Sequence, residues 1–150
     1  NEAAMEMIEN WTSPEEAERE MLGKLERKEK IMGFGHAIYK DNDPRNGIIK
    51  IWSERLAKDV GDTVLYPVSV RCEEVMWREK KLFCNADFFH ASAYHFMDIP
   101  TKLFTPIFVM SRVTGWAAHV MEQRSDNRII RPSADYTGPE LRKVPPIDAR

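Results

Sequence analysis

A glycine turn leading into a histidine is the first feature of the sequence that could take part in chemistry. Gly33 and Gly35 flank one residue and come directly before His36. Glycine adopts backbone angles that other residues avoid, and it lets a ligand approach the main chain closely. A lone histidine after a glycine turn is more often a turn or core residue than a catalytic one, and a Gly-x-Gly pair alone is weak evidence. The turn is therefore a candidate ligand contact beside an imidazole.

A helix start that could bind an anion is predicted shortly after this turn. Asp43 has the residue type of an N-cap, Pro44 suits the first helical position, and Arg45 then lies in the first turn. A helix N-terminus carries unpaired N–H groups and partial positive charge, so a guanidinium there attracts a carboxylate or a phosphate. The same residues also open helices that bind nothing. The segment thus offers an imidazole and an anion clamp close together.

Two further charged residues, Asp87 and Arg112, lie in or next to apolar runs. Asp87 comes just before the apolar run 88–97, and we expect it to cap the helix that begins there. Capping does not exclude a chemical role for its carboxylate. Arg112 lies within the long apolar helix that Thr105 and Pro106 are expected to open. Because a buried charge is costly unless it is paired, Arg112 should face a carboxylate of the protein or an anionic ligand.

Helices must position these residues, because apolar side chains recur at helical spacing and no stretch alternates with period two. The sequence therefore predicts an all-α fold. Ser13 and Pro14 supply one helix start, and Gly61 supplies one helix end. From position 127 onward the helical period is lost, so this tail needs another surface to lie on. The apolar repeats that predict helices are Ala4, Met5 and Ile8; Ala17, Met21, Leu22 and Leu25; Ile48, Ile49, Trp52, Leu56 and Val60; and Val68, Cys72, Val75, Met76 and Leu82, with Met76 and Trp77 expected to pack inside.

Composition is that of an ordinary globular chain. Of its 150 residues, 43% are hydrophobic and 31% charged, and the formal net charge is −2. This balance predicts no nucleic-acid or membrane partner, and the histidine spacing predicts no metal site. Cys72 and Cys84 lack Cys-x-x-Cys spacing, so the cytoplasm is the expected compartment. Basic residues gather near position 27, either as a solvated helix end or as a patch that steers an anionic cofactor.

Four separate segments resemble motifs of the citrate synthase family, in the order and spacing of that family. Finer features resemble the bacterial 2-methylcitrate synthases within it, among them Glu74-Val75-Met76-Trp77 and Leu103-Phe104-Thr105-Pro106. The resemblance covers almost the whole chain. The four segments are Gly33-Phe34-Gly35-His36 with Asp43-Pro44-Arg45, Asn85-Ala86-Asp87-Phe88, Ser111-Arg112-Val113-Thr114-Gly115-Trp116, and Arg128-Ile129-Ile130-Arg131-Pro132.

The resemblance implies an enzyme that joins the α-carbon of an acyl-CoA thioester to the ketone carbon of oxaloacetate and then releases coenzyme A. It favours propionyl-CoA, with acetyl-CoA also possible, and no tightly bound cofactor. It assigns Asp87 as the base and His36 as the hydrogen-bond donor to the ketone oxygen. The remaining implied roles are substrate carboxylate binding by Arg45, Arg112 and Arg131, and main-chain contact with the adenine end of coenzyme A by Ile31, Met32, Gly33, Phe34 and Gly35.

The same resemblance implies the organisation of the chain. Residues 1–87 would form a small domain that closes over substrate, and residues 88–150 the C-terminal part of a large domain with an extended arm. Arg131 would reach the neighbouring subunit's site in a homodimer. The family's first catalytic histidine falls just before the position of Asn1, so the 150 residues alone are expected to be inactive. Relatives often have Ser at the position of His90 and Pro at that of Cys84. The alternative is a catalytically silent helical dimerisation or regulatory module.

Overall fold

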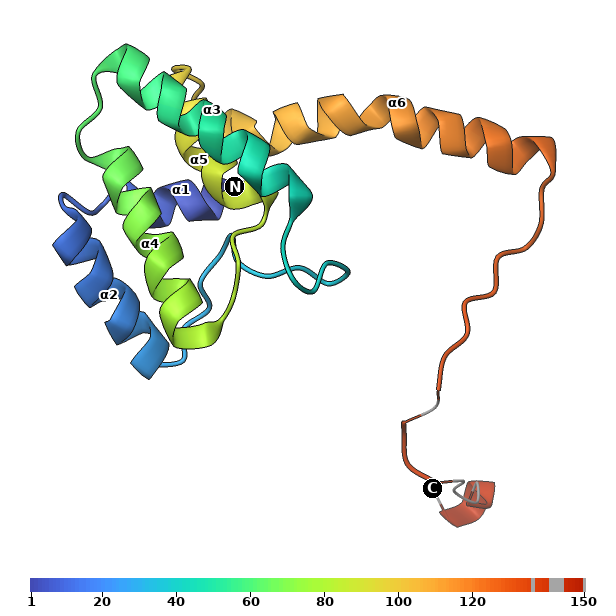
Figure 1. Cartoon of the computed structure of the whole chain (residues 1–150). Helices are drawn as coiled ribbons and strands as arrows, with labels where there is room; N and C mark the ends of the chain where they lie inside the picture. Colours follow the sequence, from blue (N-terminus) through green and yellow to red (C-terminus); the bar gives the residue numbers. More distant parts are fainter. Residues whose placement is uncertain (136, 141–144, 150) are drawn as a thin grey trace. The chain divides into compact units, whose positions relative to one another are not determined.

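The chain folds as a helical structure, as the sequence predicts. The computed structural model describes residues 1–135, 137–140 and 145–149, and in these ranges the only extended pairing is an isolated bridge between Phe34 and Cys84 (Figure 1). Tyr136 and Val144, which belong to the predicted arm, lie outside the described residues. The elements are α1 (Glu2–Ile8), α2 (Pro14–Glu26), α3 (Pro44–Val60), α4 (Leu65–Lys80), α5 (Ala86–Phe96), η1 (Thr101–Leu103), α6 (Phe104–Ser125) and η2 (Ile147–Ala149).

The chain divides into two compact units, Asn1–Thr114 and Gly115–Arg150. The first unit holds α1 to α5 and the start of α6. The second begins within α6 and continues, in its described part, through irregular chain to the short η2 helix. The predicted boundary between residues 87 and 88 stays a prediction. Among the described residues, no helix combines the length and the apolar character that crossing a membrane requires.

Helix ends follow local sequence signals, with one correction. Ser13 caps α2, Asp43 caps α3, and Gly61 ends α3 in the left-handed conformation with φ 73°, as predicted. The expectation that Asp87 caps α5 is wrong. Asn85 is the cap, because its side-chain Oδ1 accepts a hydrogen bond from the Asp87 amide at 3.0 Å. The Asp87 carboxylate therefore belongs to the first turn of α5 without serving as its cap.

The core of the first unit is formed where α3 packs on α5 and α2 packs on α4, with α1 against α5 (Figure 1). Ser53 of α3 and Ser92 of α5 are both fully buried, and their hydroxyls satisfy each other at 2.7 Å. Small side chains here let the two helices approach closely. The fully buried large side chains include Met5, Ile8, Met21, Val68, Val75, Phe88, Phe89 and Phe104.

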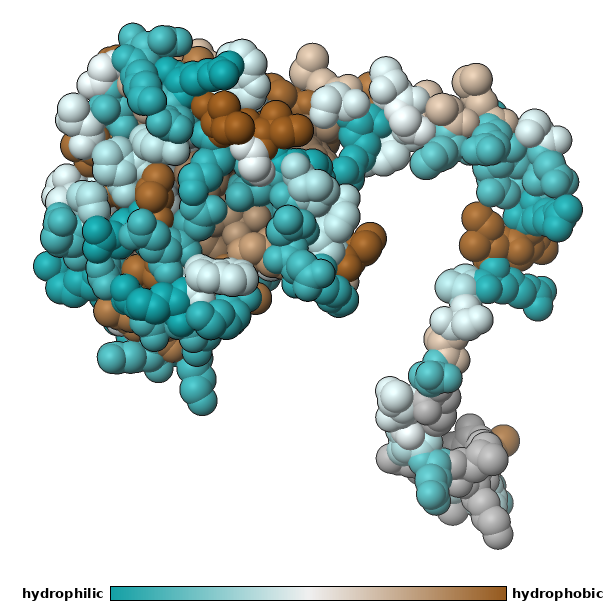
Figure 2. All heavy atoms as spheres, in the orientation of Figure 1, coloured by the Kyte–Doolittle hydropathy of each residue, from teal (hydrophilic) through white to brown (hydrophobic). Residues whose placement is uncertain are grey.

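Helix α3 shows that a helical period does not always identify the buried face. Its fully or nearly buried residues are Ser53 and Ala57, whereas Trp52 is 52% exposed, as are Ile48 and Val60 to similar extents. Figure 2 shows apolar side chains, in brown, exposed among polar ones on the surface. In α4 the expected packing of Trp77 is likewise wrong, because its ring is exposed beneath the Lys81 ammonium.

Candidate active site

The glycine turn is attached to the segment that leads into α5. The Gly35 amide donates to the Phe83 carbonyl at 2.8 Å, and the Asn85 amide donates to the Gly33 carbonyl at 2.9 Å. The side-chain amide of Asn85 also donates to the Gly35 carbonyl at 3.0 Å. Residues 33–35 and 83–85 therefore form a short antiparallel pairing. This pairing fixes the loop before His36 to the residues just before Asp87.

Both glycines of the turn take the backbone angles that the sequence suggested for them. Gly33 has φ 89° and Gly35 has φ 70°. A side chain at Gly33 would have no room, because a Cβ there would lie 2.8 and 2.9 Å from two side-chain carbons of Phe88. The ring of Phe34 stacks on the same Phe88 with centroids 4.6 Å apart. The loop thus rests closely on a buried residue of α5.

Replacing Gly33 by alanine should destabilise the chain by about 1–3 kcal/mol, because alanine adds both a left-handed backbone penalty and a clash with Phe88. Gly47→Ala is the matched control. Gly47 lies inside α3 with no atom near its would-be Cβ, so that change should stabilise by about 0.5–1 kcal/mol. Urea unfolding followed by circular dichroism checks both. If the two variants unfolded at the same urea concentration, the contact between position 33 and Phe88 would not limit the size of the residue at position 33.

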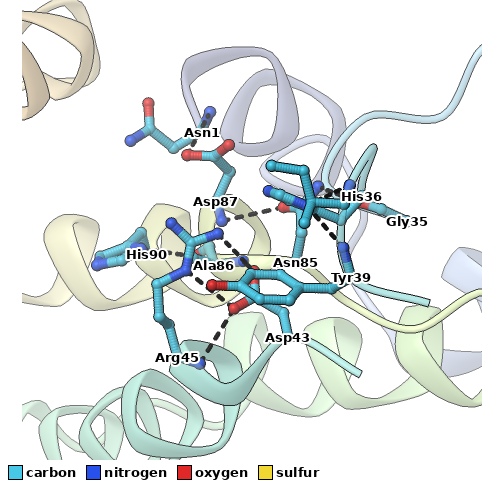
Figure 3. Close-up of polar contacts among 11 residues, drawn as sticks. Asn1, Gly35, His36, Tyr39, Asp43, Arg45, Asn85, Ala86, Asp87 and His90 are labelled. Carbon is cyan, nitrogen blue, oxygen red and sulfur yellow. Dashed lines mark hydrogen bonds and ion pairs between the residues drawn. The ribbon is translucent and has the colours of Figure 1, made fainter. Parts of the chain in front are cut away.

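A buried carboxylate, Asp43, joins the first turn of α3 to the first turn of α5 (Figure 3). Its Oδ1 accepts from the amide of Arg45 at 3.0 Å and from Arg45 Nε at 2.9 Å. Its Oδ2 accepts from Arg45 Nη2 at 2.7 Å and from the Ala86 amide at 2.9 Å. Hydrogen bonds from the Arg45 side chain, together with these amides, lower the pKa of Asp43 to about 2. Asp43 is therefore an ionised, fully bonded group at neutral pH.

His36 is held in one tautomer by the main chain. The amides of Ile38 and Tyr39 donate to its Nδ1 at 3.1 and 3.2 Å. An Nδ1 that accepts hydrogen bonds carries no proton, so in the neutral ring the proton lies on Nε2. The ring also stacks on that of Tyr39 with centroids 4.6 Å apart. His36 can therefore donate a hydrogen bond from Nε2 to a ligand.

One cavity of about 380 Å³ in the first unit brings together four of the predicted site residues. They come from the turn, from α3, from α5 and from the start of α6: His36, Arg45, Asp87 and Arg112. Asn85, Ala86, His90, Tyr94, Phe108 and Ser111 complete the lining. Ile31, Met32, Gly33, Phe34 and Gly35 lie in the adjoining loop and are not part of this lining. Arg131 belongs to the second unit, which is described by itself.

The two charged residues that the sequence placed in apolar runs are both accessible. Half of the Asp87 side chain is exposed, and its Oδ1 lies 3.9 Å from the amino nitrogen of Asn1 (Figure 3). Arg112 was expected to be a buried charge, and this is wrong. Its side chain is exposed on α6 and its guanidinium lies over the Phe108 ring, 4.3 Å from the centroid. Because its guanidinium stays in water when no ligand is bound, the folded protein has no cost of burying this charge, and the group can still bind an anion in the cavity.

His90 and Tyr94 also line the cavity, although the sequence predicted no role in the site for either of them. His90 lies on α5, and its Nδ1 is 2.5 Å from the Ala86 carbonyl. Burial lowers the pKa of His90, so its neutral form is favoured. Its ring contacts Tyr94, with centroids 5.2 Å apart. Helical spacing could have identified both residues, because positions 87, 90 and 94 lie on one face of a helix.

The described parts form an enzyme-like site on a helical body: a hydrogen-bond donor, a carboxylate and two guanidinium groups around one cavity. Residues 1–133 match the family described as citrate synthase, C-terminal domain. The chain belongs to the citrate synthase family. The resemblance noted in the sequence is thereby confirmed.

Among curated proteins, the chain is 73% identical over all 150 residues to a 2-methylcitrate synthase of Shewanella oneidensis. It is 49% identical, also over its full length, to citrate synthase 2 of Bacillus subtilis. The chain spans 40% of the length of each of these relatives. The similarity to a 2-methylcitrate synthase agrees with the finer features of the sequence.

Solved structures agree with this assignment. Citrate synthase of Thermoplasma acidophilum, in a ternary complex with carboxymethyl coenzyme A and oxaloacetate, matches 98% of the chain with a TM-score of 0.79 and 33% identity. Citrate synthase of Thermotoga maritima matches 99% with a TM-score of 0.75 and 33% identity. The chain covers 41% and 42% of those two structures, respectively.

Proposed function

We propose that this chain is the C-terminal part of a synthase that condenses an acyl-CoA with oxaloacetate and releases coenzyme A, with propionyl-CoA as the favoured thioester. The observation that carries the proposal is the cavity in which the Nε2–H donor of His36 accompanies a carboxylate and two guanidinium groups. The 73% identity to a 2-methylcitrate synthase supports the choice of propionyl-CoA.

In the proposed reaction, the Asp87 carboxylate removes a proton from the α-carbon of the thioester. The resulting enolate carbon attacks the ketone carbon of oxaloacetate, and the ketone oxygen becomes negative as the new C–C bond forms. His36 donates from Nε2 to this oxygen, which stabilises the developing charge. Water then cleaves the thioester, which frees coenzyme A. Arg45 and Arg112 hold the carboxylates of oxaloacetate through charge-assisted hydrogen bonds.

The remaining roles concern coenzyme A and assembly. The main chain of Ile31, Met32, Gly33, Phe34 and Gly35 would contact the adenine end, in a loop held rigid by Phe88. Residues 1–87 would form the closing domain and residues 88–150 would belong to the large domain. Arg131 would complete the site of a second subunit in a homodimer. The cytoplasm is the proposed compartment, where the buried, free thiols Cys72 and Cys84 would stay reduced.

A hybrid synthase tests the proposal. In it, the matched 150 residues of the Shewanella oneidensis enzyme are replaced by this chain. The hybrid should release free coenzyme A from propionyl-CoA in the presence of oxaloacetate, faster than from acetyl-CoA, and a thiol reagent measures the product. Omitting oxaloacetate should abolish the release. The 150 residues alone should show none, because the chain spans 40% of its relatives.

Two outcomes would contradict this proposal in different ways. A hybrid that folds and assembles but turns over neither thioester would support a catalytically silent module of the same fold. A hybrid that prefers acetyl-CoA would keep the reaction but change the favoured substrate. Circular dichroism and size-exclusion chromatography of the hybrid separate both outcomes from simple misfolding.

A further inference from the structure

The carboxylate of Asp43 contacts two elements that carry different parts of the site. One of its oxygens, Oδ2, accepts from Arg45 Nη2 at 2.7 Å and from the Ala86 amide at 2.9 Å. Arg45 lies in the first turn of α3, and Ala86 immediately precedes Asp87 in the first turn of α5. The side chain of Asp43 is fully buried. A single oxygen atom therefore sets the separation between the arginine and the residue next to the carboxylate of the site.

The Arg45 guanidinium is oriented by this contact. Nε and Nη2 donate to the two oxygens of Asp43 as a two-pronged pair. A guanidinium has five N–H donors in a fixed plane, so two are used and three remain for a ligand. The centroid of the Tyr39 ring lies 5.7 Å from Arg45 Cζ, so the ring further restricts the orientations open to the guanidinium. Since 45% of the Arg45 side chain is exposed, its outer edge is accessible from the cavity.

The first turn of α5 is held by two side chains. Amides at a helix N-terminus have no partner within the helix. Asp43 accepts from the Ala86 amide, and Asn85 accepts from the Asp87 amide. Of these two acceptors, Asp43 lies 43 residues from Ala86 in the sequence and is the N-cap of another helix, α3 (Figure 3). The position of the Asp87 main chain therefore depends on Asp43 as well as on the local cap.

We propose that Asp43 is a positioning residue that sets Arg45 and Asp87 at a fixed separation, so that the bound oxaloacetate and the base meet in the geometry needed for condensation. This inference rests on the proposed function of the site. Asp43 would touch neither substrate. Its effect would pass through Arg45 to the affinity for oxaloacetate and through Ala86 to the rate of C–H removal, because misplacement of reacting groups by about 1 Å can cost about 10²-fold in rate.

Asp43→Asn in the hybrid synthase tests the inference, with Asp41→Asn as the matched control. An amide accepts poorly from two amides and two guanidinium nitrogens at once, and it presents an NH₂ group to some of these donors. We expect the KM for oxaloacetate to rise about 10-fold and kcat to fall about 10–100-fold. Asp41 lies exposed in the same loop, so its replacement makes the same change of charge and should alter neither constant.

Two readouts separate positioning from a loss of folded enzyme. The kinetic isotope effect with an α-deuterated thioester should increase in Asp43→Asn, since a misplaced base makes C–H removal more rate-limiting. Partial unfolding would lower kcat with the isotope effect unchanged. In an Arg45→Leu background, Asp43→Asn should add little to the KM for oxaloacetate but should still lower kcat. Additive effects on KM would show that Asp43 does not act through Arg45.

Asp43→Glu keeps the test decisive if the asparagine variant does not fold. Glutamate retains the charge but moves the carboxylate by one methylene, so it should preserve part of the oxaloacetate affinity while kcat falls. Wild-type constants and isotope effect in a folded Asp43→Asn or Asp43→Glu variant would overturn the inference and leave the proposed function intact. If the unsubstituted hybrid has no turnover, the proposed function fails, and oxaloacetate binding measured by calorimetry still tests the link between Asp43 and Arg45.

Discussion

Asp87→Asn in the hybrid synthase should lower kcat by about 10²–10⁴-fold while leaving the affinity for oxaloacetate nearly unchanged. The range is that of general acid–base catalysis, because asparagine cannot accept the α-proton. The helix that carries the residue should survive, because Asn85 and not Asp87 caps α5. Steady-state assays give kcat, and calorimetry gives the dissociation constant of oxaloacetate. Full turnover in this variant would exclude Asp87 as the base.

Arg112→Leu is the companion variant and should show the reverse pattern. Its guanidinium lies at the cavity wall over Phe108, and leucine retains the apolar contact but no charge. Loss of charge-assisted hydrogen bonds of about 1.5–3 kcal/mol corresponds to a rise of about 10–100-fold in the dissociation constant for oxaloacetate. The kcat at saturating oxaloacetate should change much less. A larger loss in kcat than in affinity would assign Arg112 to the transition state.

Mixing Arg131→Leu subunits with Asp87→Asn subunits should restore activity that neither variant has alone. Arg131 lies in the second unit, in a stretch without regular structure, and under the proposed function it would serve a neighbouring subunit's site. A mixed dimer would then contain one site with both residues intact. Random reassociation of two-fold dimers gives about one quarter of the parent activity. Each variant incubated with itself is the control.

Failure of this complementation would contradict shared sites only if the subunits had exchanged. Native mass spectrometry of differently labelled variants checks the exchange directly. Exchanged dimers without recovered activity would assign Arg131 to the site of its own subunit. Recovery well above one quarter would indicate that one of the two substitutions is not fully inactivating.

Helix boundaries could be predicted because their signals are local. Ser13 before Pro14, Asp43 before Pro44, and Gly61 each act on the backbone within a few residues, and all three predictions are confirmed. The buried face of α3 could not be predicted from its apolar repeat. That face is chosen by the fit of Ser53 against Ser92 on another helix, which no local pattern contains.

The candidate site also has a part that the sequence predicts and a part that only the fold supplies. Family motifs predicted His36, Arg45, Asp87 and Arg112 as site residues, and in the structure these four line one cavity. Their chemical roles came from the resemblance and stay predictions. The second function of Asp43 was not visible, because its bond to the Ala86 amide joins residues 43 positions apart. A residue identified from sequence as a helix cap thus has a partner that only the fold supplies.

The pairing of the glycine turn with residues 83–85 also limits when a site can exist during folding. Asn85 and Gly35 are 50 residues apart, so their contact closes a long loop and costs chain entropy. Helices α3 and α4 lie within that loop and shorten it as they form. The loop can therefore close at lower cost after those helices than before them. An early folding species with its local helices formed would still have no substrate site, and binding of an oxaloacetate analogue would report the closing step.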